Sequence, residues 1–315
     1  MKVSTPRIAG VCRACVGILV GYLIGVPAYA ASPVSLAPPP YPNRLAETES
    51  INGLIYVSGG YSAGVPTSML QAFNPESNTW TLLASMPLTL YQGDGAGVIN
   101  SQLYVAGGWN GSLPTNTLLM FDPLSNTWTT LASLSHLSAC GATGVINSLL
   151  YVTTACNGFT GWTNLLDVYN PGTNSWTSLT GSNSAHGSPA FGVINGLFYV
   201  AGGIDGSGSV TGVLEVYNPA TNSWTTLAPM KVPVQSAASV SLNGQLYVFG
   251  GNNGTKNETT VQAYNPYTNE WKIVASLPEA LVESAAVVVY GLPFMEGDSD
   301  TGTTNQYLRI IPTIP

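Results

Sequence analysis

INGLFYVAGGIDGSGSVTGVLEVYNPATNSW, residues 194–224 of this 315-residue chain, is the stretch that decides the fold. An apolar run ends in two glycines, a polar loop follows, and an alternating segment leads through Asn218-Pro219 to Trp224. Tryptophan recurs at positions 80, 128, 176, 224 and 271, in steps of 48, 48, 48 and 47 residues. A fixed period of this length indicates an array of one repeated supersecondary unit.

Both halves of the unit recur along the chain. The phrase before each tryptophan is FNPESNTW, FDPLSNTW, YNPGTNSW, YNPATNSW or YNPYTNEW. The other half is INGLIYVSGG at 51–60, INSQLYVAGG at 99–108, INGLFYVAGG at 194–203 and LNGQLYVFGG at 242–251. Two worn copies, INSLLYVTTA at 146–155 and VYGLPFMEGD at 289–298, bring the number of units to six.

Each unit divides into four short apolar runs, which in the second unit lie near 93–99, 102–106, 118–121 and 127–131. Asn-Gly or Asn-Ser joins the first two runs, a strong signal for a tight hairpin. Asn-Pro or Asp-Pro breaks the chain before the fourth run. Four antiparallel strands per unit, with no helical periodicity, are typical of a propeller blade.

The double glycine, the aromatic residue 14 positions later and the tryptophan seven beyond it resemble the kelch repeat. The resemblance covers nearly all of the chain after residue 30, and it implies an all-β, six-bladed kelch-type β-propeller as a single domain, 31–315. We expect blades at 43–86, 90–134, 138–182, 186–230, 234–277 and 281–312, the last completed by 32–37.

The first thirty residues have the layout of a secretory signal peptide. Lys2, Arg7 and Arg13 precede an apolar run over 14–26, and Ala28-Tyr29-Ala30 offers a cleavage site after Ala30. A retained membrane anchor is the alternative, although the run is short for a bilayer span. The mature chain contains no other candidate span, so the sequence predicts a secreted or periplasmic protein.

Cleavage would leave five basic and fifteen acidic side chains, a net charge near −10. A nucleic-acid partner would require a basic stripe, and the sequence contains none. The expected partner is therefore a protein or a glycan.

The sixth unit has sequence for only three strands, and the missing strand is expected at the other end of the chain. Residues 34–37 align with 82–85, 48 positions later. The N-terminal segment is thus predicted to supply the outermost strand of the last blade, which removes an open sheet edge. The protein is expected to be a monomer.

The loops between blades and the loops between second and third strands share one face, where a binding site is expected. Residues at the start of each innermost strand should form a ring at the channel mouth. The predicted ring is Arg44, Gln92, Cys140, Ser188, Ser236 and Glu283. Arg44 and Glu283 meet across the last boundary, either as an ion pair that supports closure or as a guanidinium and a carboxylate for a polar ligand. Tyr91, Asp94, His186 and Gln235 are expected close by.

Aromatic residues outside the periodic positions, namely Trp109, Trp162 and Tyr61, lie among asparagines in the long loops. Aromatic platforms beside amide groups suit carbohydrate binding, and exposed aromatics also suit protein contacts. The repeat tryptophans and the glycine pairs, in contrast, are expected to serve packing and backbone geometry.

Cys140 and Cys156 fall almost opposite each other across a hairpin, which makes a disulfide plausible; a reactive thiol pair is the alternative, although no cation lies nearby in sequence. His136 and His186 provide two imidazoles, fewer ligands than a metal site usually requires. We therefore predict no metal site and no cofactor.

The sequence contains no catalytic signature, and no catalytic residue is assigned. The leading hypothesis is a secreted recognition module that binds a protein or glycan through its loop-rich face. The alternative is a sugar mutarotase, because the chain resembles the bacterial N-acetylneuraminate epimerase family in signal peptide, repeat count and ring closure. Ring opening would require an acid or base and a cation, roles that only Glu283 or Asp94 with Arg44 could fill.

Overall fold

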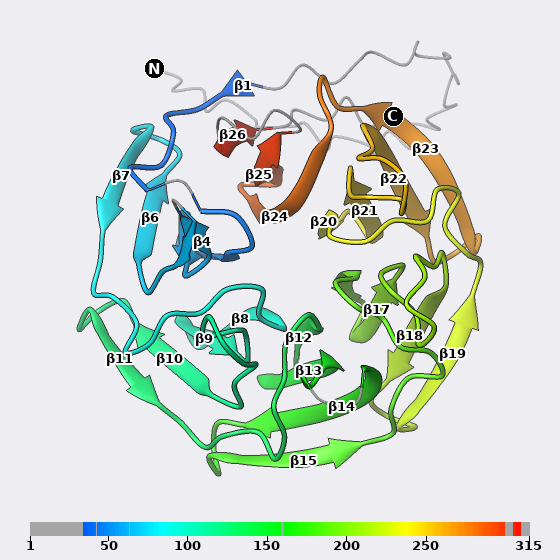
Figure 1. The fold of residues 1–315 in the computed structure, drawn as a ribbon, viewed down its shortest axis with the longest axis horizontal. Coiled ribbons are helices and arrows are strands. Elements are labelled where there is room, and N and C mark those ends of the chain that lie inside the picture. Colours follow the sequence, from blue (N-terminus) through cyan, green and yellow to red (C-terminus); the bar gives the residue numbers. More distant parts are fainter. Residues whose placement is uncertain (1–33, 42, 63, 159–160, 300–304, 310–315) are drawn as a thin grey trace, which may run out of the picture.

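The computed structural model describes residues 34–309 except 42, 63, 159–160 and 300–304. Its four-stranded antiparallel sheets, numbered here 1 to 6 in chain order, surround a central axis (Figure 1). The predicted all-β propeller fold is therefore confirmed. The proposed signal peptide, residues 1–30, lies outside the described residues. Among the residues that are described, no helix has the length and apolarity that crossing a bilayer requires.

From the channel outward, sheet 1 contains β2 (Glu47–Ile51), β3 (Leu54–Ser58), β6 (Leu70–Asn74) and β7 (Thr79–Leu82). Sheet 2 contains β8 (Gly95–Ile99), β9 (Gln102–Ala106), β10 (Leu118–Asp122) and β11 (Thr127–Thr130). Sheet 3 contains β12 (Ala142–Ile146), β13 (Leu149–Cys156), β14 (Trp162–Asn170) and β15 (Ser175–Leu179).

Sheet 4 contains β16 (Ala190–Ile194), β17 (Leu197–Ala201), β18 (Leu214–Asn218) and β19 (Ser223–Leu227). Sheet 5 contains β20 (Ala238–Leu242), β21 (Gln245–Phe249), β22 (Thr260–Asn265) and β23 (Glu270–Ser276). Sheet 6 contains β24 (Leu281–Val289), β25 (Leu292–Ser299), β26 (Asn305–Arg309) and β1 (Val34–Ser35).

Sheet 6 joins the two ends of the described chain. Strand β1 pairs with β26 in antiparallel register, with Val34 opposite Arg309 and Ser35 opposite Leu308. In the other sheets the third and fourth strands are consecutive in the chain and connected by a turn.

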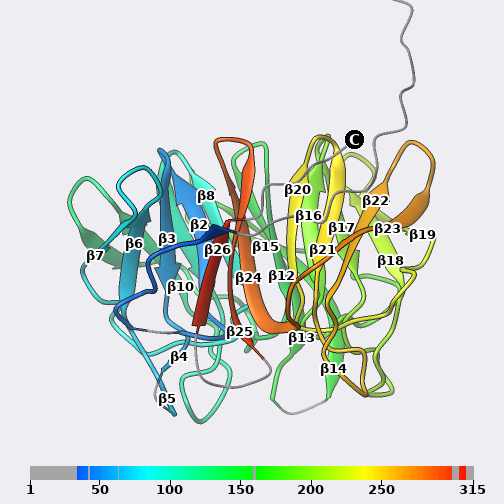
Figure 2. The ribbon, with the colours of Figure 1, turned by 90° about the horizontal axis from the view of Figure 1, so that it is seen from above.

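The two faces of the ring differ in the length of their loops. A small hairpin, β4 (Tyr61–Ser62) with β5 (Val65–Pro66), projects from one face together with the ends of β13 and β14 (Figure 2). The opposite face contains the short turns between first and second strands, where Asn52 and Gly53 both have positive φ. Positive φ at both positions is the type I′ geometry that Asn-Gly favours.

The periodic aromatic residues pack in pairs between strands. In sheets 1 to 5 the aromatic residue of the third strand contacts the tryptophan of the fourth, with ring centroids 4.9 to 5.3 Å apart. Tyr169, Tyr217 and Phe73 are fully buried in these pairs. The tilted ring geometry is one that aromatic pairs favour.

Each repeat tryptophan also forms a hydrogen-bonded clamp to the preceding sheet. In sheet 4 the Trp224 indole N–H donates to the Thr180 carbonyl at 2.8 Å, and Asn222 Oδ1 accepts from the Thr180 amide at 3.0 Å. The same pair of bonds holds Ala84, Ala132, Ala228 and, in the N-terminal segment, Ala37. Fixed spacing between Asn and Trp therefore sets how neighbouring sheets dock.

The glycine pairs permit close backbone approach at the loop-rich face. Gly202 has φ +69°, and a β-carbon there would lie 2.5 Å from the Val234 carbonyl oxygen. Only glycine accommodates this combination without strain. In sheet 3, where Thr154-Ala155 replaces the glycines, β13 instead continues to Cys156 and pairs it with Trp162.

Candidate functional site

A closed ring of main-chain hydrogen bonds surrounds the channel at the loop-rich face. One residue from each sheet contributes, and its amide donates to the carbonyl of its counterpart in the preceding sheet, at 2.7 to 3.3 Å. The ring residues are Leu45, Gln92, Cys140, Ser188, Ser236 and Glu283. All six have φ between 48° and 61°, a conformation that costs non-glycine residues about 1 kcal/mol or more each and that the ring bonds compensate.

The ring differs from the predicted one at its first position, where Leu45 stands instead of Arg44. The reason is an extra residue in sheet 2, because seven positions separate Gln92 from Ile99 whereas six separate Leu45 from Ile51. Arg44 instead forms a main-chain bridge with Tyr61.

Ring side chains place polar groups at the mouth. The Gln92 Nε2 group donates to Ser188 Oγ at 3.2 Å, which spans from sheet 2 to sheet 4. Arg44 Nη1 lies 3.3 Å from Glu283 Oε2, with 43% and 31% of their side chains exposed. The structure thus has the ion pair that was one of the two alternatives for these residues.

A belt of partly exposed aromatic residues borders this mouth. Tyr61 and Tyr91 meet edge to face with ring centroids 5.3 Å apart, and the Arg44 guanidinium lies 5.4 Å from the Tyr61 centroid. Tyr91 is bridged through its main chain to Trp109, and Trp109 packs in one small cluster with Trp162. We call Tyr61, Tyr91, Trp109 and Trp162 the aromatic belt.

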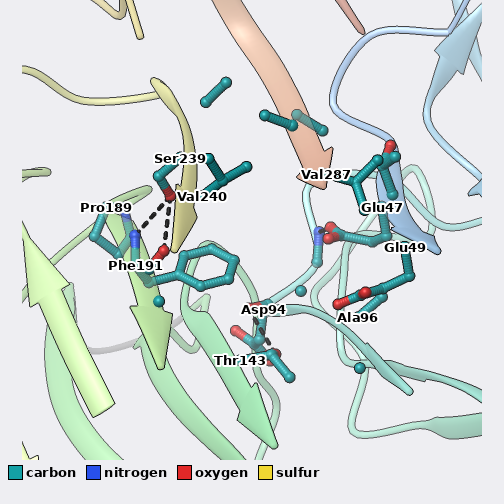
Figure 3. A pocket seen from close by; sticks show the side chains of 18 of the residues that line it. Glu47, Glu49, Asp94, Ala96, Thr143, Pro189, Phe191, Ser239, Val240 and Val287 are labelled. Atoms are coloured by element: carbon teal, nitrogen blue, oxygen red, sulfur yellow. Dashed lines mark hydrogen bonds between the residues drawn. The ribbon is translucent and has the colours of Figure 1, made fainter. Parts of the chain in front are cut away.

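Below the ring, a cavity of about 450 Å³ is lined by the inner strands of all six sheets. Figure 3 shows Glu47 and Glu49 on one wall, opposite Phe191 and Ser239. On the neutral wall the polar groups bond to one another. Ser239 Oγ accepts a hydrogen bond from the Phe191 amide at 2.8 Å and donates one to the Phe191 carbonyl at 2.9 Å. The channel therefore has an acidic half and a neutral half.

Burial raises the pKa of the acidic groups. It brings the pKa of Glu47 to about 7, against a lowering hydrogen bond from the Gly93 amide at 2.8 Å. It brings the pKa of Glu49 to about 8, with a contribution from the nearby Glu47 charge. Asp94 is fully buried, and its pKa is also well above the usual range. Glu47 and Glu49 are therefore poised to exchange protons near neutral pH.

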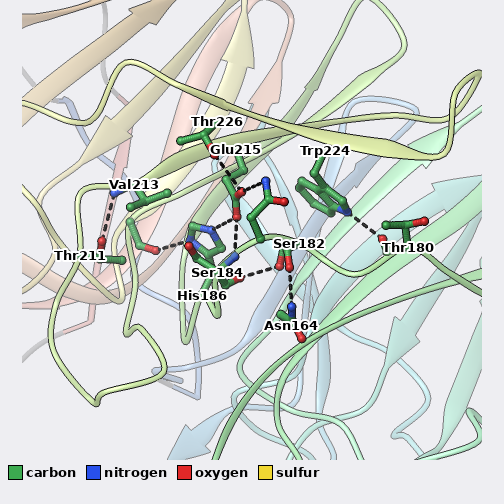
Figure 4. A network of polar contacts seen from close by, with 12 residues as sticks. Asn164, Thr180, Ser182, Ser184, His186, Thr211, Val213, Glu215, Trp224 and Thr226 are labelled. Carbon is green, nitrogen blue, oxygen red and sulfur yellow. Dashed lines mark hydrogen bonds and ion pairs between the residues drawn. The ribbon is translucent and has the colours of Figure 1, made fainter.

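The two histidines have structural partners. His186 is buried; its Nδ1 lies 2.7 Å from the Gly202 carbonyl and its Nε2 3.0 Å from Glu215 Oε2 (Figure 4). Burial would raise the pKa of Glu215, but hydrogen bonds from His186, Asn183 and the Ser184 amide outweigh it and lower the pKa. The structure therefore does not bring His186 to the mouth as a ligand contact.

Glu215 belongs to a set of polar residues that occupy one position of the third strand and hold the linker entering their own sheet. Gln71 bonds the main chain of Tyr41, and Gln262 bonds the main chain of Val232, each with its amide as donor and acceptor. In sheet 3, Asp167 Oδ2 lies 3.2 Å from His136 Nε2. The sequence signal was one polar residue inside LQAF, LDVY, LEVY and VQAY.

The cysteines meet without forming the predicted disulfide. Cys140 and Cys156 are both free thiols, and Cys156 packs against the small cluster that contains Cys140. Among the described residues, no group of three or more His, Cys, Asp or Glu side chains is arranged to hold a metal ion.

Comparison with known proteins agrees with this architecture. A family model described as "Attractin/LZTR1 beta-propeller" matches residues 55–278. A solved structure titled "Structure of YjhT" superposes with a TM-score of 0.75 at 17% identity, over 87% of this chain and 95% of that one. Identity at that level shows a shared fold. No curated protein matches the chain.

Proposed function

Because the chain belongs to the Attractin/LZTR1 beta-propeller family, we propose that it is a recognition module whose loop-rich face binds a glycan. The observation that carries this proposal is the aromatic belt beside a polar ring. Sugars present apolar C–H faces to aromatic rings and hydroxyl edges to amide, hydroxyl and charged groups.

The polar groups suited to the hydroxyl edges are Gln92, Ser188 and Ser236 of the ring, with the Arg44–Glu283 pair beside them. The belt supplies the stacking surfaces on the side of sheets 1 to 3. The 450 Å³ cavity under the ring is within the range of small-molecule sites, about 300 to 1,000 Å³, and supports a ligand that enters the mouth.

Saturation-transfer NMR against a panel of free sugars, including sialic acid, tests this proposal. We expect transfer to at least one sugar, lost in Trp109→Ala and Trp162→Ala. Tyr267→Ala is the matched control, because Tyr267 is 84% exposed in a turn before β23, away from the belt. Binding that survives both belt variants would contradict the proposal.

A protein partner is the rival within the same class, since exposed aromatic residues also serve protein interfaces. A sugar and a protein partner would differ in how much of the loop-rich face they cover. A sugar would protect only the ring and the belt from hydrogen exchange, whereas a protein partner would also protect loops outside the belt, such as 252–259. No saturation transfer to any sugar of the panel, together with this wider protection from hydrogen exchange, would favour a protein partner.

A second candidate function, sugar mutarotase or epimerase activity, is supported by the acidic wall of the channel. Glu47 and Glu49 have pKa values of about 7 and 8, and such groups can donate and accept protons near neutral pH. They suit acid–base roles better than the predicted Glu283, which pairs with Arg44, or Asp94, which is fully buried.

Anomer exchange in the same NMR experiment separates the two functions. Accelerated exchange that disappears in Glu47→Gln and Glu49→Gln would support catalysis in the channel. Saturation transfer with unchanged exchange would support the pure recognition module.

We also propose that the protein is exported and acts as a monomer. The basic and apolar pattern of residues 1–30 supports export, and the paired outermost edge of sheet 6 supports a monomer. N-terminal sequencing of the secreted protein should begin at residue 31, and sedimentation should give the mass of one chain. An intact N-terminus would favour the membrane-anchor alternative.

A further inference from the structure

The two cysteines occupy a rigid position at the loop-rich end of sheet 3. Cys140 is a ring residue whose amide and carbonyl are bonded to Gln92 and Ser188 at 3.3 and 2.7 Å. Cys156 ends β13 and exchanges two main-chain hydrogen bonds of 3.0 Å with Ala139. Both sulfurs are therefore carried by segments joined to each other through the backbone.

The two thiols lie in one small cluster, in which Cys156 and Trp109 pack against Cys140 and its neighbours Ala139 and Ala155. Interaction with the Cys140 thiol, more than with the Gly158 amide, lowers the pKa of Cys156 to about 6, against the effect of burial. The same interaction and burial raise the pKa of Cys140.

The acidic groups near the two cysteines raise the pKa of a thiol instead of lowering it. The Asp94 carboxyl raises the pKa of Cys140, and Cys156 in turn raises that of Asp94. Cys140 also contributes to the raised pKa of Tyr91, which precedes its ring neighbour Gln92. The interactions that lower the pKa of Cys156 therefore have to outweigh these neighbours.

Exposure separates the two thiols. Cys140 is 5% exposed, behind the ring, whereas Cys156 is partly exposed beside Trp162. A reagent that approaches from the loop-rich face meets Cys156 first. Cys140 is then the nearest thiol to any group attached there.

We propose that Cys156 and Cys140 form a thiol–disulfide exchange site, with Cys156 as the attacking thiol and Cys140 as the resolving thiol, whose substrates are small or protein-borne disulfides. The Cys156 thiolate attacks one sulfur of the substrate, a mixed disulfide forms, and the first substrate thiolate leaves. Cys140 then loses its proton to solvent and attacks Cys156 Sγ, which releases the second thiolate. The protein loses two electrons and the substrate disulfide gains them.

The first test uses the reduced full-length protein and 5,5′-dithiobis(2-nitrobenzoate). We expect Cys156 and Cys140 together to release two thionitrobenzoate ions in consecutive phases, and peptide mapping to find Cys140 bonded to Cys156 with no reagent retained at Cys156. Mapping assigns the reaction irrespective of Cys12 and Cys15. A retained adduct at Cys156, or no reaction there, would overturn the proposal, as would a Cys140–Cys156 bond that only unfolding allows to be reduced.

The second test measures the pH dependence of Cys156 alkylation by iodoacetamide. The wild-type midpoint should lie near 6, and in Cys140→Ala it should move toward about 8.5, the ordinary thiol value. Less thiolate, partly offset by greater nucleophilicity, should slow the reaction at pH 6.5 about five- to tenfold. Cys140→Ser keeps a donor and should restore part of the rate.

A wild-type midpoint at the ordinary thiol value would overturn the proposal, and so would equal profiles in Cys140→Ala and Cys140→Ser. Thermal unfolding of both variants checks that the ring is intact. If either variant fails to fold, the wild-type midpoint and the peptide mapping of the wild-type reaction still decide the question.

Discussion

Sheet 4 and the closure region, formed by sheets 6 and 1, use the same clamp but differ in how their outer strands are held. In sheet 4, β18 and β19 are joined by a turn and pair over five positions. In sheet 6, β26 and β1 come from opposite ends of the described chain and pair over two positions. The short ladder alone would be weak, so the N-terminal segment depends on contacts further along.

Those further contacts run from the N-terminal segment and sheet 1 to sheet 6. Ala37 is clamped by Asn78 and Trp80 of sheet 1. Ser50 Oγ donates to the Val288 carbonyl at 3.2 Å, and the Tyr290 ring covers Gly53. Several small contacts therefore hold the N-terminal segment against its neighbours, whereas in sheet 4 a turn also joins the two outer strands.

The largest effect is expected from removing the closing strand. A chain that begins at residue 38 lacks both β1 and the Ala37 clamp, and the exposed edge of β26 costs the fold several kcal/mol. We expect the midpoint of thermal unfolding to fall by about 10 °C or more. A chain that begins at residue 34 is the matched control, and equal midpoints for the two would contradict closure by the N-terminal strand.

The second effect concerns the wall of sheet 1, where Glu47 and Glu49 line the cavity opposite Phe191 and Ser239. Their folded pKa values of about 7 and 8 exceed the value of 4.5 for an unperturbed glutamate. The unfolded chain therefore loses these protons first as pH rises. The stability they contribute is fully present below about pH 4.5 and is lost as pH rises toward 8.

Denaturant unfolding between pH 4 and 9 measures this loss, which we expect to be about 2 to 4 kcal/mol for the two groups together. The double variant Glu47→Gln, Glu49→Gln should show a flatter profile and exceed the wild type at pH 8. Glu270→Gln, on the exposed edge of β23, should leave the slope unchanged. A wild type that gains stability from pH 5 to 8 would refute the assignment.

The third effect compares one clamp at two places. Trp80→Phe and Trp224→Phe each remove an indole N–H from a main-chain carbonyl, at a cost of about 1 kcal/mol. The Thr180 that Trp224→Phe releases directly follows β15, so it stays attached to sheet 3. At the closure region the released Ala37 loosens the whole N-terminal segment, so Trp80→Phe should also speed proteolysis near residue 37. Equal proteolysis of the two variants would show that the clamp has one role throughout.

The repeat period was sufficient to predict the strands, the face with long loops and the position of the ring to within one residue. The prediction of Arg44 as the first ring residue was wrong, because it was placed exactly 48 residues before Gln92. Sheet 2 has one extra residue between its ring position and Ile99, in the segment where Gly95 has φ +125°. The spacing before Ile51 in sheet 1 is one residue shorter, so the ring residue there is Leu45.

The acidic wall formed by Glu47 and Glu49, and the third-strand polar residues that bond to the linkers, were not predicted from the sequence, for a different reason. Alternating Glu47 and Glu49 follow the pattern of a solvated strand face, and only the closed ring turns that face toward a channel. Single polar residues such as Gln71 and Glu215 lie inside apolar runs, and their partners are linkers about 30 residues away. Such pairs depend on packing between segments that no local pattern connects.

The smallest effect is expected from the Arg44–Glu283 pair. A double-mutant cycle with Arg44→Gln and Glu283→Gln should give a coupling below about 1 kcal/mol, because both side chains are substantially exposed. High salt should reduce it further. A coupling of about 3 kcal/mol or more would mark the pair as a closure element comparable with the Ala37 clamp. A weak coupling instead means that a ligand can draw both charges into new hydrogen bonds at little cost to the fold, which is the property that a binding mouth requires.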